Sequence, residues 1–585
     1  MSSLSPGGPT TSHTGEESSA SSIINVDTSE GILVPEADAD VGLVDEAGNA
    51  YVTASTPAGD EASKKALRDH LRWTLNKKDS YTDTDVTSRR SRRRKASIDI
   101  DKVSLEIADV YPPRQYFVLT DAGKPVRSND HDSDDLASIM GIMQALISVF
   151  LDDGDKLRCI NAGNTRINIL MRPPLYYACV SSWGEPESVT RSHLEYLYLQ
   201  VLSVVTVSQL RRIFERRTNF DLGRLLGGSE ILVHSLLDRV ENDMAMGMSS
   251  LHCLKLDPVV RSRAANHLIP TSKMKDLLYL VLVAQGRVIT LARPKKHSIH
   301  PAGNVSRIQS AMSYLWFLLD LHILMNTAHS PSIVNSSASA SWLPLCLPKY
   351  NASGFVHVFV TFLQSEAYSD SGASAPEPKA KSRISPSGDL PSWTLAQEGD
   401  STKTELPNRD AISSADVGLM CVTANGDFES IRAWCDVVTG RLEHDGTLTS
   451  IEKTVRNGLT EYSVADLSIP GLRHFIYKSR AHVQITTPIY EEPYDDIKER
   501  RRLITLYQTM HDNIHAKSGQ DLPLKLQYIR TEKEAVMGWI TQPFEMYIAV
   551  SQGLPKSAII SAANAVARWV KKEEGKLFLR DAPIF

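Results

Sequence analysis

The densest group of potential metal ligands in the sequence is the pair His297 and His300, three residues apart in the basic segment 293–301. A metal site needs further ligands at defined spacings, and none lies close in the sequence. A basic surface loop after a strand explains the segment better. We therefore predict no metal and no cofactor.

Four carboxylates, those of Asp130, Asp132, Asp134 and Asp135, could also hold a cation. They precede or open an apolar helical segment, where carboxylates accept from free N–H groups and complement the helix dipole. Helix capping is the favoured interpretation. No GxxxxGK[ST] phosphate loop and no nucleophile–base pair is found. We predict a protein without covalent catalysis.

A polybasic run ends at Ser97, a candidate phosphorylation site with arginines three and four residues upstream. Three interpretations stay open: a nuclear import or nucleic-acid signal, a membrane-surface patch, and a solvated linker that is phosphorylated. The basic residues are Arg89, Arg90, Arg92, Arg93, Arg94 and Lys95.

The segment before this run has the composition of a helix in an anionic membrane interface. Leu67, Leu71 and Leu75 recur every four residues beside Trp73 on a basic background. Residues 1–63 hold eleven acidic residues and no Lys or Arg, and such a segment is predicted to be disordered. One hypothesis is that this acidic tail folds back on the basic run and is released by phosphorylation of Ser97.

The globular part repeats one pattern three times: strand, tight turn, strand and amphipathic helix. In the first copy three further strands and three helices follow, in the order of a longin domain. The strands of the three copies are 114–120 and 125–127, 277–284 and 287–292, and 472–479 and 482–487; the helices include 134–150, 320–325 and 497–515.

Length and cysteine content agree with this organisation. A chain of 585 residues suggests roughly four domains of about 150 residues, or three domains and a tail. The six cysteines include no CxxC pair, and no apolar run reaches the roughly 18 residues of a membrane span. With no secretory signal found, a reduced, cytoplasmic protein is expected.

Five blocks of the sequence resemble the Mon/SAND family, the three-longin subunits called Mon-one in the Mon-Ccz complex. The resemblance runs from about residue 114 to residue 585. The blocks are 123–126, 136–146, 276–282, 286–301 and 566–572.

The resemblance implies a heterodimer with a Ccz-family subunit that acts as a guanine nucleotide exchange factor. Its substrate would be the late-endosomal and vacuolar Rab GTPase, in vesicle fusion with the vacuole, endosome maturation and autophagy. It also implies an upstream early-endosomal Rab and an anionic phosphoinositide surface on late endosomes, multivesicular bodies, prevacuolar and vacuole membranes. No nucleic-acid partner is implied. The alternative is a longin-type trafficking scaffold or tether without exchange activity.

We therefore predict an α/β (α+β) chain with three longin domains, each a five-stranded antiparallel sheet with flanking helices. The divisions are a disordered regulatory tail at 1–110 and longin domains at 111–250, 251–465 and 466–585. Partner and GTPase contacts are assigned to Lys124, Pro125, Asp134, Asp135, Leu136, Ser138 and Ile139, and to Trp342, for which core packing is the alternative.

Two segments of the second domain depart from the family pattern. Residues 303–319 separate a His-Pro dipeptide from Asp320-Leu-His322, which adjoin in the family. This segment is interpreted as a retained intron, with a genuine loop as the alternative. Residues 365–415 are rich in Ser, Pro, Glu and Lys and are expected to be a disordered insertion.

Overall fold

A computed structural model gives the fold of the globular part of the chain. It describes residues 111–120, 125–127, 133–152, 157–217, 220, 226, 229–270, 276–294, 307–330, 340–365, 417–520, 522–580 and 582–583. The predicted tail at 1–110 and residues 366–415 of the predicted insertion lie outside these ranges.

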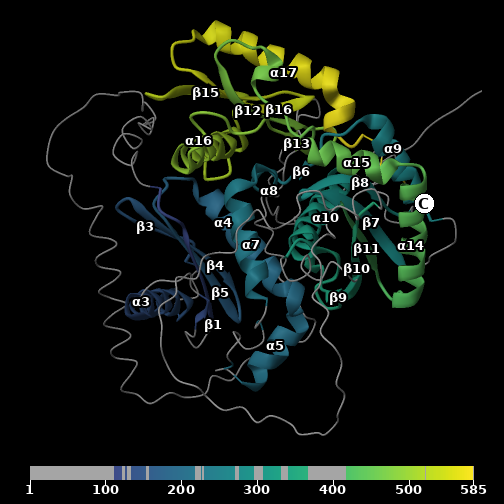
Figure 1. The fold of residues 1–585 in the computed structure, drawn as a ribbon. Helices are drawn as coiled ribbons and strands as arrows, with labels where there is room; N and C mark the ends of the chain where they lie inside the picture. The colour runs from purple at the N-terminus through teal and green to yellow at the C-terminus, as the bar shows by residue number, and fades with distance from the viewer. Residues whose placement is uncertain are drawn as a thin grey trace, which may run out of the picture.

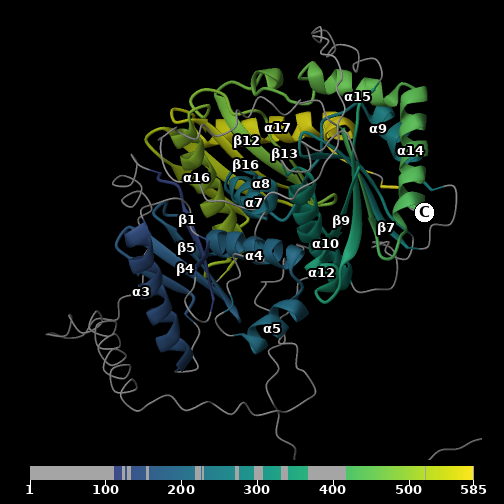
Figure 2. The ribbon, with the colours of Figure 1, turned by 60° about the horizontal axis from the view of Figure 1, so that its bottom comes forward.

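Three sheets, each with helices on both faces, form the described structure (Figures 1 and 2). In sheet 1 the order is β2-β1-β5-β4-β3, and all neighbours are antiparallel. This is the sheet that the sequence predicted for the first unit. Its strands are β1 (Gln115–Thr120), β2 (Pro125–Arg127), β3 (Cys159–Ala162), β4 (Thr165–Arg172) and β5 (Leu175–Ser181).

Sheet 2 repeats this topology in the order β8-β7-β11-β10-β9, again with every neighbour antiparallel. Alternate residues of the inner strand β7 belong to different cores: Leu280 and Leu282 pack on one face of the sheet, Val281 and Val283 on the other. The strands are β7 (Leu277–Ala284), β8 (Arg287–Ala292), β9 (Ser341–Leu345), β10 (Val356–Leu363) and β11 (Val417–Thr423).

Sheet 3 differs from the prediction because it has six strands and one parallel pair. Its order is β14-β15-β16-β12-β13-β6, and β6 (Leu251–His252) lies parallel to β13. The chain leaving the first unit passes the open edge of β13, where the Leu251 N–H donates to the Val483 carbonyl at 3.1 Å. The other strands are β12 (Leu472–Ser479), β13 (Gln484–Thr486), β14 (Leu526–Arg530), β15 (Glu534–Ile540) and β16 (Phe544–Ser551).

Different helices cover the two faces of each sheet. Over sheet 1 these are α3 (Ser133–Asp152) and α4 (Glu187–Val204), the latter joined by α5 (Val207–Arg216), α7 (Glu230–Asn242) and α8 (Met244–Gly247). Over sheets 2 and 3 they are α9 (Pro258–His267), α10 (Arg307–Ala328), α12 (Pro348–Asn351), α14 (Phe428–His444), α15 (Thr447–Arg456), α16 (Ile497–His515) and α17 (Lys556–Leu577).

Most of the segment 303–319 lies in the helix α10. From Arg307 onward this segment is the first part of a continuous helix rather than a loop. Leu318 is buried in the core of sheet 2, and the adjacent Leu319 packs against the core of the first unit. A helix that is apolar on two sides is expected where it is buried between two cores.

Asn326 fastens α10 to the first unit through a buried polar junction. Its amide nitrogen donates to Gln200 Oε1 at 2.9 Å and to the Leu232 carbonyl at 2.8 Å, and its Oδ1 accepts from Ser235 at 3.0 Å. Without Asn326, Gln200 Oε1, the Leu232 carbonyl and the Ser235 hydroxyl would each lose this hydrogen bond. Among the described helices, none is long and apolar enough to cross a membrane.

We predict that Asn326→Ala lowers the free energy of unfolding by about 2–3 kcal/mol, because the buried partners lose their hydrogen bonds. Denaturant unfolding of the purified chain measures this. The matched control is Asn242→Ala, an exposed asparagine that donates to the Asp238 carbonyl at 2.9 Å, which should change stability by less than about 0.5 kcal/mol. If both variants lost the same free energy of unfolding, the hydrogen bonds of Asn326 would not stabilise the contact between α10 and the first unit.

Candidate functional site

The outer corner of the first unit is formed by the edge strand β2 and the helix α3. The strand β2 pairs with β1, in the register Val118↔Arg127, and no strand among the described residues lies beyond it. Figures 1 and 2 both place α3 on the outside of the molecule, whereas α4 lies between sheet 1 and the other units. Among the described residues, this corner is therefore a part of sheet 1 that is open to another protein.

The inner side of α3 belongs to a small separate core. Met143 and Ile147 are buried there against Phe117, Leu119 and Ile169 of the sheet. They are four residues apart and share one helix face. Their burial fixes the helix on the sheet and decides which of its residues face outward.

The outer side of α3 is apolar as well. Ile142 is 59 % exposed and Leu151 is 39 % exposed. They are nine residues apart and therefore lie on opposite flanks of the buried stripe, and the sequence of 141–151 contains no charged residue. A surface helix normally carries polar residues opposite its core stripe, and exposed apolar patches mark interaction sites. The outer face of α3 is suited to binding an apolar surface rather than to acid–base chemistry.

Ile142, the most exposed large apolar side chain described in α3, is not among the residues that the sequence predicted for partner contact. Ile142 lies off the stripe of core residues, and a large apolar residue in that position was the available signal. Among the predicted residues, Pro125 lies in β2, Lys124 lies outside the described residues, and Asp134, Asp135, Leu136, Ser138 and Ile139 lie in the first turns of α3. Their assignment to partner contacts stays a prediction.

The predicted membrane and phosphorylation residues are not part of this corner or of any described element. They lie outside the described residues and stay predictions: Leu67, Leu71, Trp73, Arg89, Arg90, Arg92, Arg93, Arg94, Lys95 and Ser97.

Trp342 is half-buried at the edge strand β9. Its ring stacks on His357 with a centroid distance of 5.1 Å and meets the edge of Phe428 at 5.7 Å. It packs against the core of sheet 2. These contacts favour the core alternative over a partner anchor.

An aromatic and cationic stack joins the first unit to the third. The guanidinium of Arg114 lies 3.6 Å from the Trp183 ring centroid, and that of Arg501, on α16, lies 5.2 Å from it. Arg501 also donates to the Tyr111 carbonyl at 3.0 Å. Arg114 is fully buried and its Nε donates to Glu185 at 2.8 Å. Such cation–π contacts contribute most where the cation is desolvated.

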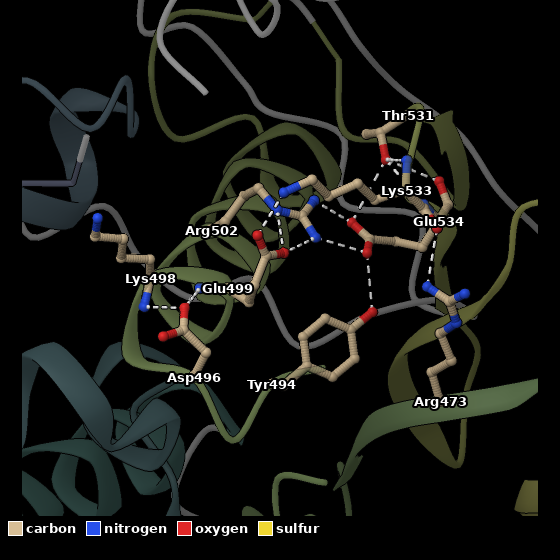
Figure 3. A network of polar contacts seen from close by, with 9 residues as sticks. All are labelled: Arg473, Tyr494, Asp496, Lys498, Glu499, Arg502, Thr531, Lys533 and Glu534. Atoms are coloured by element: carbon tan, nitrogen blue, oxygen red, sulfur yellow. Dashed lines mark hydrogen bonds and ion pairs between the residues drawn. The ribbon is translucent and has the colours of Figure 1, made fainter. Parts of the chain in front are cut away.

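A polar network holds the start of α16, and with it Arg501, in place (Figure 3). Next to Arg501, Arg502 forms a two-pronged ion pair with the buried Glu534 and also donates to Glu499 at 2.9 Å. Tyr494 donates to Glu534 Oε2 at 2.9 Å. Burial alone would raise the pKa of Glu499, but hydrogen bonds from Lys533 and Arg502 outweigh it and lower that pKa.

The family-like segment 320–322 is structural in this fold. Asp320 accepts from the backbone N–H groups of Lys349 and Tyr350 at 3.1 and 2.8 Å, in the short helix α12. Burial raises the pKa of Asp320 to about 7, although these two hydrogen bonds favour its ionised form. His322 Nε2 lies 2.9 Å from the Ser250 carbonyl, and burial lowers its pKa to about 4. Asp320 thus joins α10 to α12, and His322 joins α10 to the backbone at Ser250.

Comparisons with known proteins agree with this architecture. Residues 114–236 match the family described as the first Longin domain of FUZ, MON1 and HPS1, and residues 471–574 match the third Longin domain of the same proteins. The first match covers sheet 1 with α3, α4, α5 and the first part of α7. The second covers sheet 3 without β6, together with α16 and most of α17.

Whole-chain relatives include three proteins named vacuolar fusion protein MON1 or its homolog A. One from Cryptococcus neoformans var. neoformans serotype D is 42 % identical over 539 residues, which cover 90 % of this chain and 74 % of the relative. Identity to a relative from Mycosarcoma maydis is 30 %, covering 81 % and 69 % of the two chains. Identity to homolog A of Gallus gallus is 31 %, covering 80 % and 72 %.

We predict opposite outcomes for alanine substitutions on the two sides of α3. Ile147→Ala should destabilise the chain by about 2–4 kcal/mol because it leaves a cavity in the small core. Ile142→Ala should change stability by less than about 0.5 kcal/mol because the side chain is mostly exposed. Thermal unfolding of both variants measures this. A comparable loss in Ile142→Ala would mean that this side of α3 is internal.

We also predict that Glu534→Gln destabilises the chain by about 3 kcal/mol, because the buried Arg502 then loses its two-pronged ion pair and keeps only Glu499 as a counter-ion. The control is Glu573→Gln, which removes an ion pair of 2.7 Å with the half-exposed Lys576 and should cost less than about 1 kcal/mol. Hydrogen exchange should rise at the start of α4 in Glu534→Gln alone. If hydrogen exchange at the start of α4 did not change, the polar network would not stabilise the contact between the third unit and the first.

Proposed function

The chain belongs to the MON1 family of vacuolar fusion proteins, and we propose that it acts there as one subunit of a heterodimeric guanine nucleotide exchange factor. Family membership assigns it to vacuolar fusion and membrane trafficking. In the proposal its partner is a Ccz-family subunit, and its substrate is the late-endosomal or vacuolar Rab GTPase.

The observation that carries the proposal is the uncharged, exposed side of α3 beside the open edge of β2. A second longin domain would also have an outer helix face and an open sheet edge, which can pair with those of this chain. Pairing between the two along the flank of α3 that carries Ile142 would bury this side chain and would create a continuous surface from two first domains. The exchange platform is proposed to be this composite surface.

Exchange requires no covalent step. A GTPase releases its nucleotide faster when a partner binds the nucleotide-free conformation more tightly than the nucleotide-bound one, because the difference in affinity shifts the equilibrium. Displacing a switch segment weakens the contacts to Mg²⁺ and phosphate. An apolar platform without a nucleophile or acid–base pair is chemically sufficient for this task.

The proposed recruitment uses the N-terminal region. The basic and amphipathic segments at 64–75 and 89–95 would bind anionic phosphoinositide membranes of late endosomes, and an upstream early-endosomal Rab would add a second contact. Two weak contacts on one membrane raise the effective concentration of the complex there. Phosphorylation of Ser97 would release the acidic tail from the basic run and so free that run for the membrane.

The alternative is a trafficking scaffold or tether that binds a GTPase without accelerating nucleotide release. Both functions can use the outer corner of the first unit, so binding alone does not distinguish them. The distinguishing quantity is the rate of nucleotide release.

We predict that Ile142→Asp weakens assembly with the Ccz-family subunit by at least about tenfold, or about 1.4 kcal/mol, because a carboxylate is then buried in an apolar contact. The control is Val437→Asp on α14, where the native valine is 50 % exposed. Release of fluorescent GDP from the vacuolar Rab on charged liposomes should be accelerated by the native pair and by Val437→Asp, and lost with Ile142→Asp. GTPase binding without faster release would favour the scaffold.

A further inference from the structure

Two histidines of α16 and one glutamate of β16 converge inside the third unit. His511 and His515 are one helical turn apart and therefore share a face of α16. His511 Nδ1 lies 2.9 Å from Glu545 Oε1, and His515 Nε2 lies 3.1 Å from the same oxygen. The three ligand atoms lie within 4.8 Å of one another.

The spacing of these atoms is close to that of a metal's ligands. Tetrahedral zinc with nitrogen and oxygen ligands at about 2.0–2.1 Å holds its ligands roughly 3.3 Å apart. The two observed nitrogen–oxygen distances are a few tenths of an ångström shorter. Two histidines at a spacing of four residues together with one glutamate make up the ligand set of a known class of zinc sites.

One ligand atom has no satisfactory partner within the chain. His515 Nε2 is buried and makes no hydrogen bond, because its approach to Glu545 lacks hydrogen-bond geometry despite the short distance. A buried polar atom without a partner is unfavourable and calls for an explanation. A metal ion bound at this nitrogen would supply one.

We propose that His511, His515 and Glu545 form a site for a divalent transition-metal ion, with Zn²⁺ as the best match. The Tyr547 hydroxyl donates to Glu545 Oε1 at 2.6 Å and would orient the carboxylate as an outer-shell group does. The remaining coordination position falls to water. The site is independent of the proposed exchange platform on the first unit.

Two lysines set the conditions for binding. Lys478 lies 3.6 Å from the other carboxylate oxygen, Oε2, and donates to the Met248 carbonyl at 2.9 Å, so it leaves Oε1 to the metal. Lys517 Nζ lies 3.1 Å from His511 Nε2. When Nδ1 binds a metal, Nε2 carries a proton, so Lys517 must turn away. The contact of Lys517 with His511 therefore competes with metal binding at this histidine.

The site would act on the junction between the first and third units. His511 and His515 bracket Asp512, whose carboxylate accepts from Ser188 in the first turn of α4 and from Ser518 at 2.6 Å. A metal that ties this turn of α16 to β16 would hold Asp512 in place. Metal binding would then stabilise the contact that positions sheet 1.

The test uses the full-length chain, stripped with a chelator and titrated with Co²⁺ and then Zn²⁺. We expect one equivalent of Co²⁺ to give the intense visible bands of a tetrahedral site, Zn²⁺ to bleach them, and Zn²⁺ to raise the melting temperature. His515→Gln should weaken binding at least about tenfold, whereas His482→Gln, a half-buried histidine elsewhere in the third unit, should not.

Absence of tetrahedral bands in the native chain, or undiminished bands in a folded His515→Gln variant, would overturn the proposal. Undiminished bands would assign the metal to other residues. Lys517→Gln provides a second measurement that leaves the three ligands intact, and it should bind Co²⁺ several-fold more tightly than the native chain. Unchanged affinity would refute the role of Lys517 as competitor.

Discussion

The central strands of all three sheets are buried on both faces, and this burial determines where every helix must lie. In β7, β11 and β16 nearly every residue is buried, so each sheet needs a helical layer on either side. The same strand order recurs in the three sheets, which explains why one local pattern appears three times in the sequence. Contacts with other proteins are left to outer helix faces and to sheet edges.

The two helices over sheet 1 have become different because their surroundings differ. Helix α4 is surrounded, since its outer side meets α7, α10 and α16, and residues such as Leu197 and Gln200 are buried. Helix α3 has only the sheet beneath it, and Ile142 projects outward. Apolar residues around α4 serve internal packing, whereas on α3 only those that face the sheet do so, and Ile142 is left exposed. This asymmetry is the reason for proposing α3 as the binding helix of the first unit.

The local pattern of the chain predicted the elements well, and the long-range contacts were beyond it. Gly286, with its positive φ of 68°, marked the turn of one hairpin, and alternating apolar residues marked the strands. The parallel strand β6, the stack of Arg501 on Trp183 and the cluster around Glu545 each join residues far apart in sequence. Only the i,i+4 spacing of His511 and His515 was visible locally, and without Glu545 it carries no ligand set.

The blocks that resemble the family turn out to lie at internal junctions as much as at surfaces. The Arg293 N–H donates to the Pro583 carbonyl at 3.2 Å, and Val566 is buried under sheet 3. Such residues preserve the arrangement of three longin units, and a shared arrangement is what the comparisons with relatives report. The proposed exchange activity would depend on the surface that this arrangement presents. The junctions can therefore identify the family, whereas the activity has to be tested at α3.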